Sequence, residues 1–351
     1  MPRSVSVVVS ARNDDHGGNF LRRFRVFAES LLAQAARAGL AGELIVVDWN
    51  SPDGSAPLGE AAALNEAPAH FPVRFIEVPH ELHLRLPNSD RIPFFQMISK
   101  NVGIRRAHGE YVLATNCDVL FSNELVEYLA HGPLHPRQMY RLDRLDVAPD
   151  VPEEAPVDDR LRWCRRNVIR RHTWLRSRIL NEKFRLDSRD WFESLDGLVS
   201  RCVRLLAYWL KGRWKPLIAH TNACGDFTLL ARDVWHALRG YPELPLWSMH
   251  LDSLLCYNAV ASGMRQIILR DPVRLYHMEH GKGWAGLTVP EKYRIFGQRP
   301  WIDMGLVEEL RREMARTGEP ILFNGPGWGL ADAVLAEYPE EQLAHVSERQ
   351  H

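Results

Sequence analysis

The sequence predicts an α/β protein with a mostly parallel central sheet flanked by helices and a basic, mainly helical insertion. Three observations lead to this prediction. Short β-branched runs alternate with segments of helical apolar spacing, polar residues follow several of these runs, and basic residues gather in residues 160–215. In such folds the ligand crevice lies beyond the carboxyl ends of the strands, which is where we look for function.

Size and composition describe a globular protein with ample material for a core. The 351 residues include 44 basic and 44 acidic side chains, and 46% are hydrophobic. This composition excludes intrinsic disorder and fibrous classes. A net charge of zero argues against wholesale nucleic-acid binding, because the phosphate backbone favours a basic surface. We therefore expect no nucleic-acid partner.

The spacing of the cysteines and the hydropathy of the chain predict the cellular compartment of the protein. The five cysteines are at least 22 residues apart and contain no C-x-x-C pair, which favours a reducing compartment. Residues 1–10 lack the apolar core and cleavage site of a signal peptide, and no uncharged apolar stretch is long enough to span a bilayer. We expect a cytoplasmic protein that is at most peripheral to the inner face of a membrane.

The first part of the chain alternates strands and helices. Residues 4–10 (SVSVVVS) and 44–48 (LIVVD) are β-branched runs typical of strands buried on both faces. The expected order is strand, helix, strand, strand, helix, strand, over residues 4–10, 20–39, 44–48, 73–78, 93–108 and 111–115. This order predicts a sheet whose carboxyl ends meet at one edge.

Polar residues follow three of these strands. Ala11, Arg12 and Asn13 come after the first, the second ends at Asp48, and Asn116 and Asp118 follow the later one. Each of these polar segments alone is also typical of an ordinary turn, since Asn, Asp, Ser, Pro and Gly commonly follow strands. Their joint occurrence favours a shared crevice.

A proline-rich acidic connector, residues 149–156 (PDVPEEAP), introduces a segment of different character. Residues 160–215 contain sixteen Lys or Arg against five Asp or Glu, a local net charge of +11, and five tryptophans. Residues 198–210 are apolar on most helical positions, and basic residues around such a helix suit an anionic lipid surface. The same residues also fit a helical subdomain whose tryptophans pack on the sheet and whose arginines are solvated.

The last third of the chain returns to strands and helices. Strands are expected at residues 227–231, 266–269 and 273–277, and helices at residues 234–238, 252–263 and 307–317. Glycines, Trp284 and Pro290 beyond Gly281 indicate a mobile loop before the last helix.

Asp118 and a distant histidine have the ligand types for a divalent cation that bridges a diphosphate. Carboxylate oxygens suit Mg²⁺ or Mn²⁺, and an imidazole favours Mn²⁺. His277 and His280 are the candidates, although a lone histidine is more often a core or surface residue. Their i, i+3 spacing places them on opposite faces of a continuing strand, so we expect one of them to bind metal.

The amino-terminal segments resemble the nucleotide-sugar half of glycosyltransferase family 2 and its GT-A-fold relatives. The resemblance is carried by residues 4–13, 43–55 (ELIVVDWNSPDGS) and 101–121 (NVGIRRAHGEYVLATNCDVLF). The family pattern there is a valine-rich strand, an E-I-I-V-V-D-D-G-S-x-D-G strand and turn, and an N-x-G-x-x-x-A-x-G-E-Y-I helix and strand ending in D-x-D. Residues 225–243 (GDFTLLARDVWHALRGYPE), followed by Asp252, are similar to the acceptor-side half of galactosyltransferase-type members.

The resemblance implies a GT-A (Rossmann-like) fold in four parts. Residues 1–148 would be the nucleotide-sugar-binding half, 149–218 the basic insertion, 219–290 the acceptor-side half with the catalytic loop, and 291–351 a helical tail.

The resemblance also implies roles for single residues on the donor side. Ala11, Arg12 and Asn13 would line the base pocket, and Asp48 would contact the base or ribose. Asp118 would hold Mn²⁺ or Mg²⁺, with His277 as a further ligand and Asn116 beside it. Lys100 would contact the diphosphate.

Two positions depart from the family pattern. Asn116 stands where the first Asp of the D-x-D is expected, and Trp49 replaces the second Asp of the V-V-D-D element. An amide oxygen coordinates or hydrogen-bonds, but with less charge to hold a dication.

On the acceptor side, Asp252 falls where the family places its catalytic base, although an Asp before Ser-Leu-Leu is also a normal helix start. Asp226 is a candidate for a sugar hydroxyl, or else a buried capping carboxylate. Trp284 is a candidate for stacking on the sugar from a glycine-hinged loop, with core packing as the competing interpretation.

Two functions follow as hypotheses. The first is a metal-assisted, inverting glycosyltransferase that moves a sugar from a nucleotide diphosphate sugar to a glycan or lipid-linked acceptor in surface-polysaccharide or glycolipid assembly. The second is a catalytically silent scaffold of the same fold that binds a nucleotide or a glycan, a hypothesis supported by Asn116 and Trp49.

Overall fold

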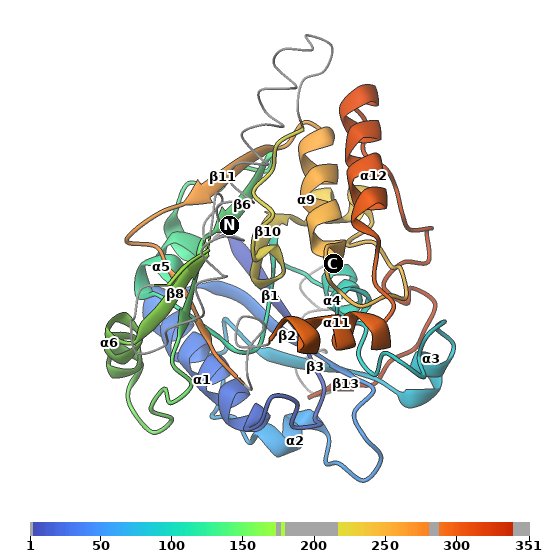
Figure 1. The fold of residues 1–351 in the computed structure, drawn as a ribbon. Coiled ribbons are helices and arrows are strands. Elements are labelled where there is room, and N and C mark those ends of the chain that lie inside the picture. Colours follow the sequence, from blue (N-terminus) through green and yellow to red (C-terminus); the bar gives the residue numbers. More distant parts are fainter. Residues whose placement is uncertain (1–2, 173–176, 180–216, 281–287, 340–351) are drawn as a thin grey trace, which may run out of the picture.

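The computed structural model describes residues 3–172, 177–179, 217–280 and 288–339. These residues form an α/β fold in which helices flank a mixed sheet (Figure 1). The strand order in this sheet is β11-β6-β10-β4-β1-β2-β3-β13. Its strands are β1 (Ser4–Ala11), β2 (Ala41–Trp49), β3 (Val73–Val78), β4 (Tyr111–Thr115), β6 (Gln138–Leu142), β10 (Phe227–Ala231), β11 (Arg265–Leu269) and β13 (Glu337–Tyr338).

The sheet is parallel in its centre and mixed at its sides. Strands β4, β1, β2 and β3 run parallel to one another, whereas β10 is antiparallel to both of its neighbours and β13 is antiparallel to β3. The predicted parallel character therefore holds for the four strands with βα alternation. At one edge β11 is parallel to its neighbour β6, whereas at the other edge β13 enters in the opposite direction.

Both faces of the central strands are buried, which explains why their sequences are continuous apolar runs. Along β1, Val5, Val7 and Val9 face one apolar cluster, and Val8 faces another. Strand β2 alternates in the same way. The first cluster is covered by α1 (Phe20–Ala38), α2 (Leu58–Ala62) and α5 (Asn123–His131), and the second by α4 (Gln96–Arg105), α8 (Arg232–Leu238), α9 (Leu251–Ala261) and α12 (Met304–Thr317).

A second sheet, ordered β5-β12-β7-β8-β9, begins three residues after β4 ends. Its strands are β5 (Val119–Phe121), β7 (Arg144–Val147), β8 (Val168–His172), β9 (Ser177–Ile179) and β12 (Leu275–Met278). Alternate residues of β7 and β12 divide between its faces. Leu145, Val147, Tyr276 and Met278 join an apolar cluster with α6 (Val157–Arg166), and Asp146 pairs in register with His277.

One expectation about element type is wrong, and another falls largely outside the described residues. The described part of the basic insertion begins with α6 and then supplies β8 and β9 to the second sheet. Residues 180–216, which include the apolar helix expected over residues 198–210, lie outside the described residues. The expected loop before the last helix contains α11 (Val289–Gln298), which starts at a capping box formed by Thr288 and Glu291.

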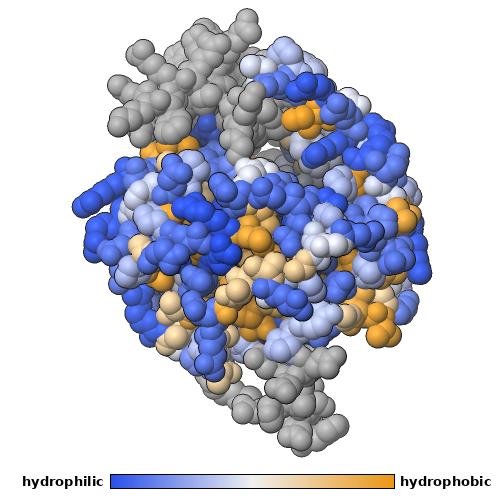
Figure 2. All heavy atoms as spheres, turned by 90° about the horizontal axis from the view of Figure 1, so that it is seen from below, coloured by the Kyte–Doolittle hydropathy of each residue, from blue (hydrophilic) through white to orange (hydrophobic). Residues whose placement is uncertain are grey.

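The surface is chemically mixed. Seen from below the view of Figure 1, hydrophilic residues cover most of the face and apolar residues gather near its middle (Figure 2). Among the described residues, no helix has the length and apolar character that crossing a membrane requires.

Candidate functional site

The candidate site lies where the first sheet passes into the second. Asn116 and Asp118 occupy the turn between β4 and β5. The backbone N–H of Met278 donates to the carbonyl of Asp118 over 2.9 Å, so the end of β12 is fixed beside this turn. Two segments about 160 residues apart in the chain are thereby brought together.

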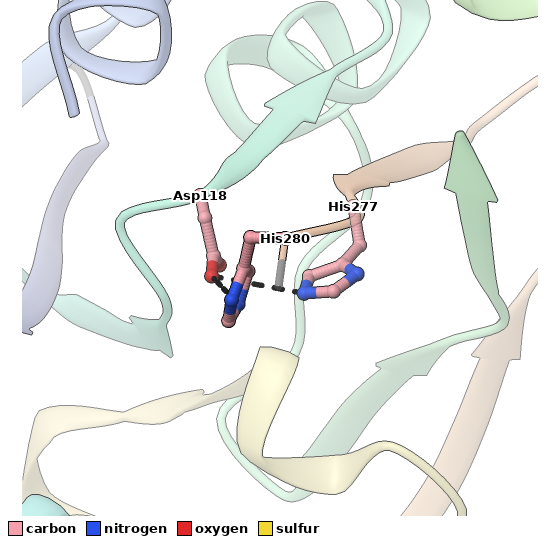
Figure 3. A group of neighbouring side chains, drawn as sticks. All are labelled: Asp118, His277 and His280. Atoms are coloured by element: carbon pink, nitrogen blue, oxygen red, sulfur yellow. Dashed lines mark ion pairs between the residues drawn. The ribbon is translucent and has the colours of Figure 1, made fainter. Parts of the chain in front are cut away.

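Asp118, His277 and His280 form a compact cluster, with their side chains directed toward one another (Figure 3). Oδ2 of Asp118 lies 3.0 Å from Nε2 of His280 and 3.7 Å from Nε2 of His277. The three ligand atoms lie within 4.8 Å of one another. Metal bonds of about 2.1 Å place neighbouring ligand atoms about 3.0–3.4 Å apart, so a small adjustment would let all three bind one ion.

The chemistry of the cluster also fits a cation. Oδ1 of Asp118 is buried and has no hydrogen-bond partner among the residues that the structure describes. No lysine or arginine in that part of the chain forms an ion pair with this carboxylate. A buried acceptor without a partner is costly, and a bound cation would satisfy it.

The protonation of the cluster reflects this concentration of charge. Burial opposes ionisation of Asp118, but the His277 and His280 rings outweigh it and hold the pKa of the carboxyl well below its usual range. Burial and the Arg144 guanidinium oppose charging of His277, whereas Asp118 and Asp146 raise its pKa to about 10. Asp118 and His277 therefore stabilise each other's charged forms.

His280 joins the cluster because β12 ends at Met278. The expectation that one of the two histidines binds metal assumed a strand that continues through both residues. After the strand ends the chain turns, and His280 approaches Asp118 more closely than His277 does. Gly17, in the loop after β1, packs so closely on the His280 ring that a Cβ there would overlap its Nδ1 atom.

The Asn116 side chain is bound into the protein. Its Oδ1 accepts hydrogen bonds from Gln96 Nε2 (2.9 Å) and Lys100 Nζ (2.7 Å), and its Nδ2 donates to Asp226 Oδ1 (2.5 Å). The amide oxygen is therefore directed away from the metal-ligand cluster. A second carboxylate at this position would face that of Asp226, which explains why an amide fits.

Lys100 is completely buried on α4 beneath this turn. Its Nζ donates to Asn116 Oδ1 and to the carbonyl of Gly225, both over 2.7 Å. Burial lowers its pKa to about 8, against the opposing effect of the Asp226 and Asp252 carboxylates. The ammonium thus supports the site from within, and its described contacts are protein acceptors.

Asp226 connects the turn to the second sheet. It is buried in the short 3₁₀ segment Cys224–Asp226, and both of its oxygens are engaged: Oδ1 by Asn116 and Oδ2 by Arg144 NH1 at 2.8 Å. Arg144 also contacts Asp146 through Nε at 2.8 Å. Asp226 is therefore part of a buried charge network that includes Asn116, Lys100 and Arg144.

Asp252 lies in the first turn of α9, beside Gly225. Its Oδ1 accepts from the N–H of Ser253 over 2.8 Å, and its Oδ2 is 3.2 Å from where a Cβ on Gly225 would be. The carboxylate is half-buried. The fold thus brings Asp252 to the same region as Asn116, Lys100 and Asp226.

The tips of β1 and β2 are paired with each other. Ala11 is in register with Asp48, and Arg12 Nε donates to the carbonyl of Asn50 over 2.7 Å. The backbone N–H of Asn13 donates to Ser51 Oγ over 2.8 Å. Asp48 is buried, and its oxygens accept from Ser51 Oγ and the N–H of Leu58. Burial raises the pKa of Asp48.

Two tryptophans that the sequence analysis singled out are not among the described residues around the turn between β4 and β5. Trp49 is completely buried and donates from Nε1 to His83 over 3.1 Å, so it belongs to the core. Trp284 lies outside the described residues. Sequence reasoning missed Asp146 and Arg144, because R-L-D-V is too short to distinguish a charged strand face from a loop.

No family model matches the chain, and no curated protein matches it significantly.

Proposed function

We propose that this protein is a metal-assisted glycosyltransferase that transfers a sugar, with inversion, from a nucleotide diphosphate sugar to a glycan or lipid-linked acceptor. The observation that carries the proposal is the convergence of Asp118, His277 and His280 at the carboxyl edge of β4, with Asp252 beside the same turn. The resemblance to GT-A glycosyltransferases supports the same assignment from the sequence.

Asp118, His277 and His280 would hold the cation, Mn²⁺ or Mg²⁺. When bound, it supplies positive charge that stabilises the departing diphosphate. Two imidazoles with one carboxylate favour Mn²⁺ over Mg²⁺, which prefers oxygen ligands. The donor nucleotide would lie along the edge formed by the tips of β1 and β2.

Asp252 would act as general base. In the proposed reaction the bond from the anomeric carbon to the diphosphate breaks, and its electron pair leaves with the diphosphate. The acceptor oxygen forms the new bond from the opposite face, and its proton passes to Asp252 Oδ2, while the Ser253 N–H holds Oδ1. Single displacement of this kind inverts the anomeric configuration.

The experiment measures nucleoside diphosphate release from UDP-, GDP- and dTDP-sugars with Mn²⁺, before and after Asp252→Asn and Asp118→Ala. We expect each substitution to lower turnover by about 10²–10⁴-fold, the usual contribution of a general base or a cation site. Asp252→Asn should leave Mn²⁺ affinity unchanged, and Asp118→Ala should abolish it.

Asp233→Asn is the matched control. Asp233 is the second residue of α8, as Asp252 is of α9, but it is exposed and remote from the cluster. Its turnover should equal that of the wild type. A glycosyltransferase assignment is untenable if Asp252→Asn turns over like the Asp233 control.

A catalytically silent nucleotide- or glycan-binding scaffold is the second candidate. The observation that favours it is Asn116, whose oxygen is committed to Gln96 and Lys100 and adds no charge to the cation site. Under this alternative the wild type would bind nucleotide in a thermal-shift titration, yet release no diphosphate from any donor.

A further inference from the structure

His277 faces a carboxylate on each side of its ring. Its Nε2 lies 3.7 Å from Asp118 Oδ2, and its Nδ1 lies 3.2 Å from Asp146 Oδ1. When a metal displaces the proton from one nitrogen of an imidazole, the other nitrogen keeps its proton. The chemistry of the site therefore depends on which carboxylate takes the proton.

Each nitrogen belongs to a different group of three ligand types. His277 forms one group with Asp118 and His280 and another with Asp146 and Glu279. Its Nε2 is paired with Asp118, and its Nδ1 with Asp146. The two groups share one ring, so the neutral ring cannot give a lone pair to both. The positively charged side chains near each group determine which of the two groups can bind the metal.

Arginines already neutralise the second group. Asp146 is fully buried, with Arg144 Nε 2.8 Å from its Oδ1 and Arg170 NH1 3.4 Å from its Oδ2. The same Arg170 nitrogen is 3.6 Å from Glu279. A dication placed among these groups would be repelled by two guanidinium charges, so this side is suited to receive a proton and not a metal.

The first group has no such compensation. Asp118 contacts only the two histidine rings among charged groups of the described chain, and its Oδ1 has no hydrogen-bond partner there. Its side chain is also 16% exposed, whereas that of Asp146 is 0% exposed, so within the described residues the Asp118 side is the more accessible to an ion.

We propose that Asp146 is a positioning residue for the cation site. His277 Nδ1 and Asp146 Oδ1 lie 3.2 Å apart and neither has a hydrogen-bond partner among the described residues. When an ion binds at Nε2, Asp146 would accept the Nδ1 proton and so direct the Nε2 lone pair toward Asp118 and His280. The parallel pairing of β7 with β12 places Asp146 directly beside His277, and Arg144 and Arg170 keep the carboxylate ionised and fixed. Partners of this kind orient a metal-binding imidazole and raise its basicity. The inference rests on the proposed metal site.

The test measures Mn²⁺ affinity from the electron paramagnetic resonance signal of the free ion, without donor or acceptor. Asp146→Asn keeps the volume of the side chain and removes its charge. We expect Mn²⁺ to bind the variant about 10–100-fold more weakly than the wild type. Asp143→Asn is the control: this neighbouring carboxylate contacts His220 and Arg171, and its loss should change affinity less than twofold.

The outcomes separate the two proposals. Wild-type protein that binds no Mn²⁺ overturns the metal site and this inference together. Wild-type binding that persists unchanged in Asp146→Asn overturns this inference alone and leaves the metal site standing.

A second measurement decides the matter if Asp146→Asn fails to fold. Histidine ¹⁵N spectra of the wild-type Zn²⁺ complex, with His277 assigned through His277→Asn, report which nitrogen carries the proton. A protonated Nδ1 and a metal-bound Nε2 support the inference. The reverse assignment overturns it.

Discussion

At the residue scale, the cation site depends on a glycine far from it in the chain. Gly17 has φ +74° and leaves no room for a side chain, because a Cβ would overlap Nδ1 of His280. Neighbouring Gly18 has nearly the same backbone, φ +76°, but nothing lies within 4 Å of the position of its Cβ. Substitutions of Gly17 and Gly18 therefore cause the same backbone strain, but only a substitution of Gly17 also displaces the metal-ligand candidate His280.

We predict that Gly17→Ala and Gly18→Ala each lower the free energy of unfolding by about 1–2 kcal/mol, the cost of a left-handed conformation for alanine. Only Gly17→Ala should also weaken Mn²⁺ binding, by about tenfold or more, because it displaces His280. Urea unfolding and Mn²⁺ titration measure the two effects. Equal Mn²⁺ affinities in the two variants would show that His280 is not a ligand.

Asn116 shows how a residue that departs from a family pattern acquires a physical reason. The sequence indicated only that a carboxylate is missing. The structure shows the hydrogen-bond partners of the Asn116 side chain. Lys100 and Gln96 donate to it, so they require an acceptor, and Asp226 accepts from it, so it requires a donor. An amide meets both needs, and no local pattern around residue 116 could have predicted partners from α4 and from Asp226.

At the element scale, a buried ion-pair network ties the carboxyl-terminal strand to the sheet. Glu43 on β2 accepts from Ser6 Oγ (2.6 Å) and Arg74 NH1 (2.6 Å), and Arg74 NH2 donates to Glu337 on β13 (2.8 Å). Burial alone would raise the pKa of Glu43, but His108 and Arg74 outweigh it and lower the pKa to about 2.

This network predicts acid sensitivity. The pKa of Glu43 is lower in the folded state than its ordinary value of 4.5, so its contribution to stability is complete above about pH 4.5 and is lost as pH falls toward about 2. The shift corresponds to about 3 kcal/mol. In urea unfolding between pH 6 and pH 2.5, Glu43→Gln should be less stable at pH 6 and should lose less stability on acidification.

Exposed Glu66→Gln is the control and should follow the wild-type pH profile. Parallel profiles for Glu43→Gln and the wild type would contradict the role of this carboxylate.

Sequence patterns predicted the elements whose residues are buried in a regular pattern along the chain. Strands β1, β2 and β4 are covered on both faces, and their β-branched runs are visible without a structure. Strands β5 and β7 have three and four residues, respectively, and pair with partners far along the chain. Helix α11 lies in a stretch where glycine and proline suggested a loop, although Thr288 and Glu291 carried a capping signal.

At the scale of the whole molecule, residues from both sheets meet at one turn. The sequence predicted the participants Asp118 and His277, because strand ends and ligand types are local properties. It did not predict Asp146 or Arg144, whose roles depend on the pairing of β7 with β12. Long-range strand pairing is the information that a single sequence lacks.

Because the cluster requires both sheets, a cation should stabilise the folded state selectively. We predict that Mn²⁺ at about a hundredfold excess over its dissociation constant adds about 2.7 kcal/mol to the free energy of unfolding and raises Tm by several degrees. Mg²⁺ should raise Tm less, since two of the three ligands are imidazoles. Differential scanning fluorimetry measures both shifts, and removal of the ion with EDTA should reverse them.

Asp118→Ala is the matched variant for this measurement and should show no Mn²⁺-dependent shift. A shift that survives in Asp118→Ala would assign the stabilising ion to another part of the protein.

Because the ligands come from distant parts of the chain, ion binding at the turn between β4 and β5 requires that both parts are present and folded. The candidate ligands come from residue 118 and from residues 277–280, so the pieces meet only after most of the polypeptide has been synthesised and both sheets have assembled. A truncated or half-assembled chain would have no complete coordination sphere. Stoichiometric ion uptake would thus report the fraction of intact protein in a preparation.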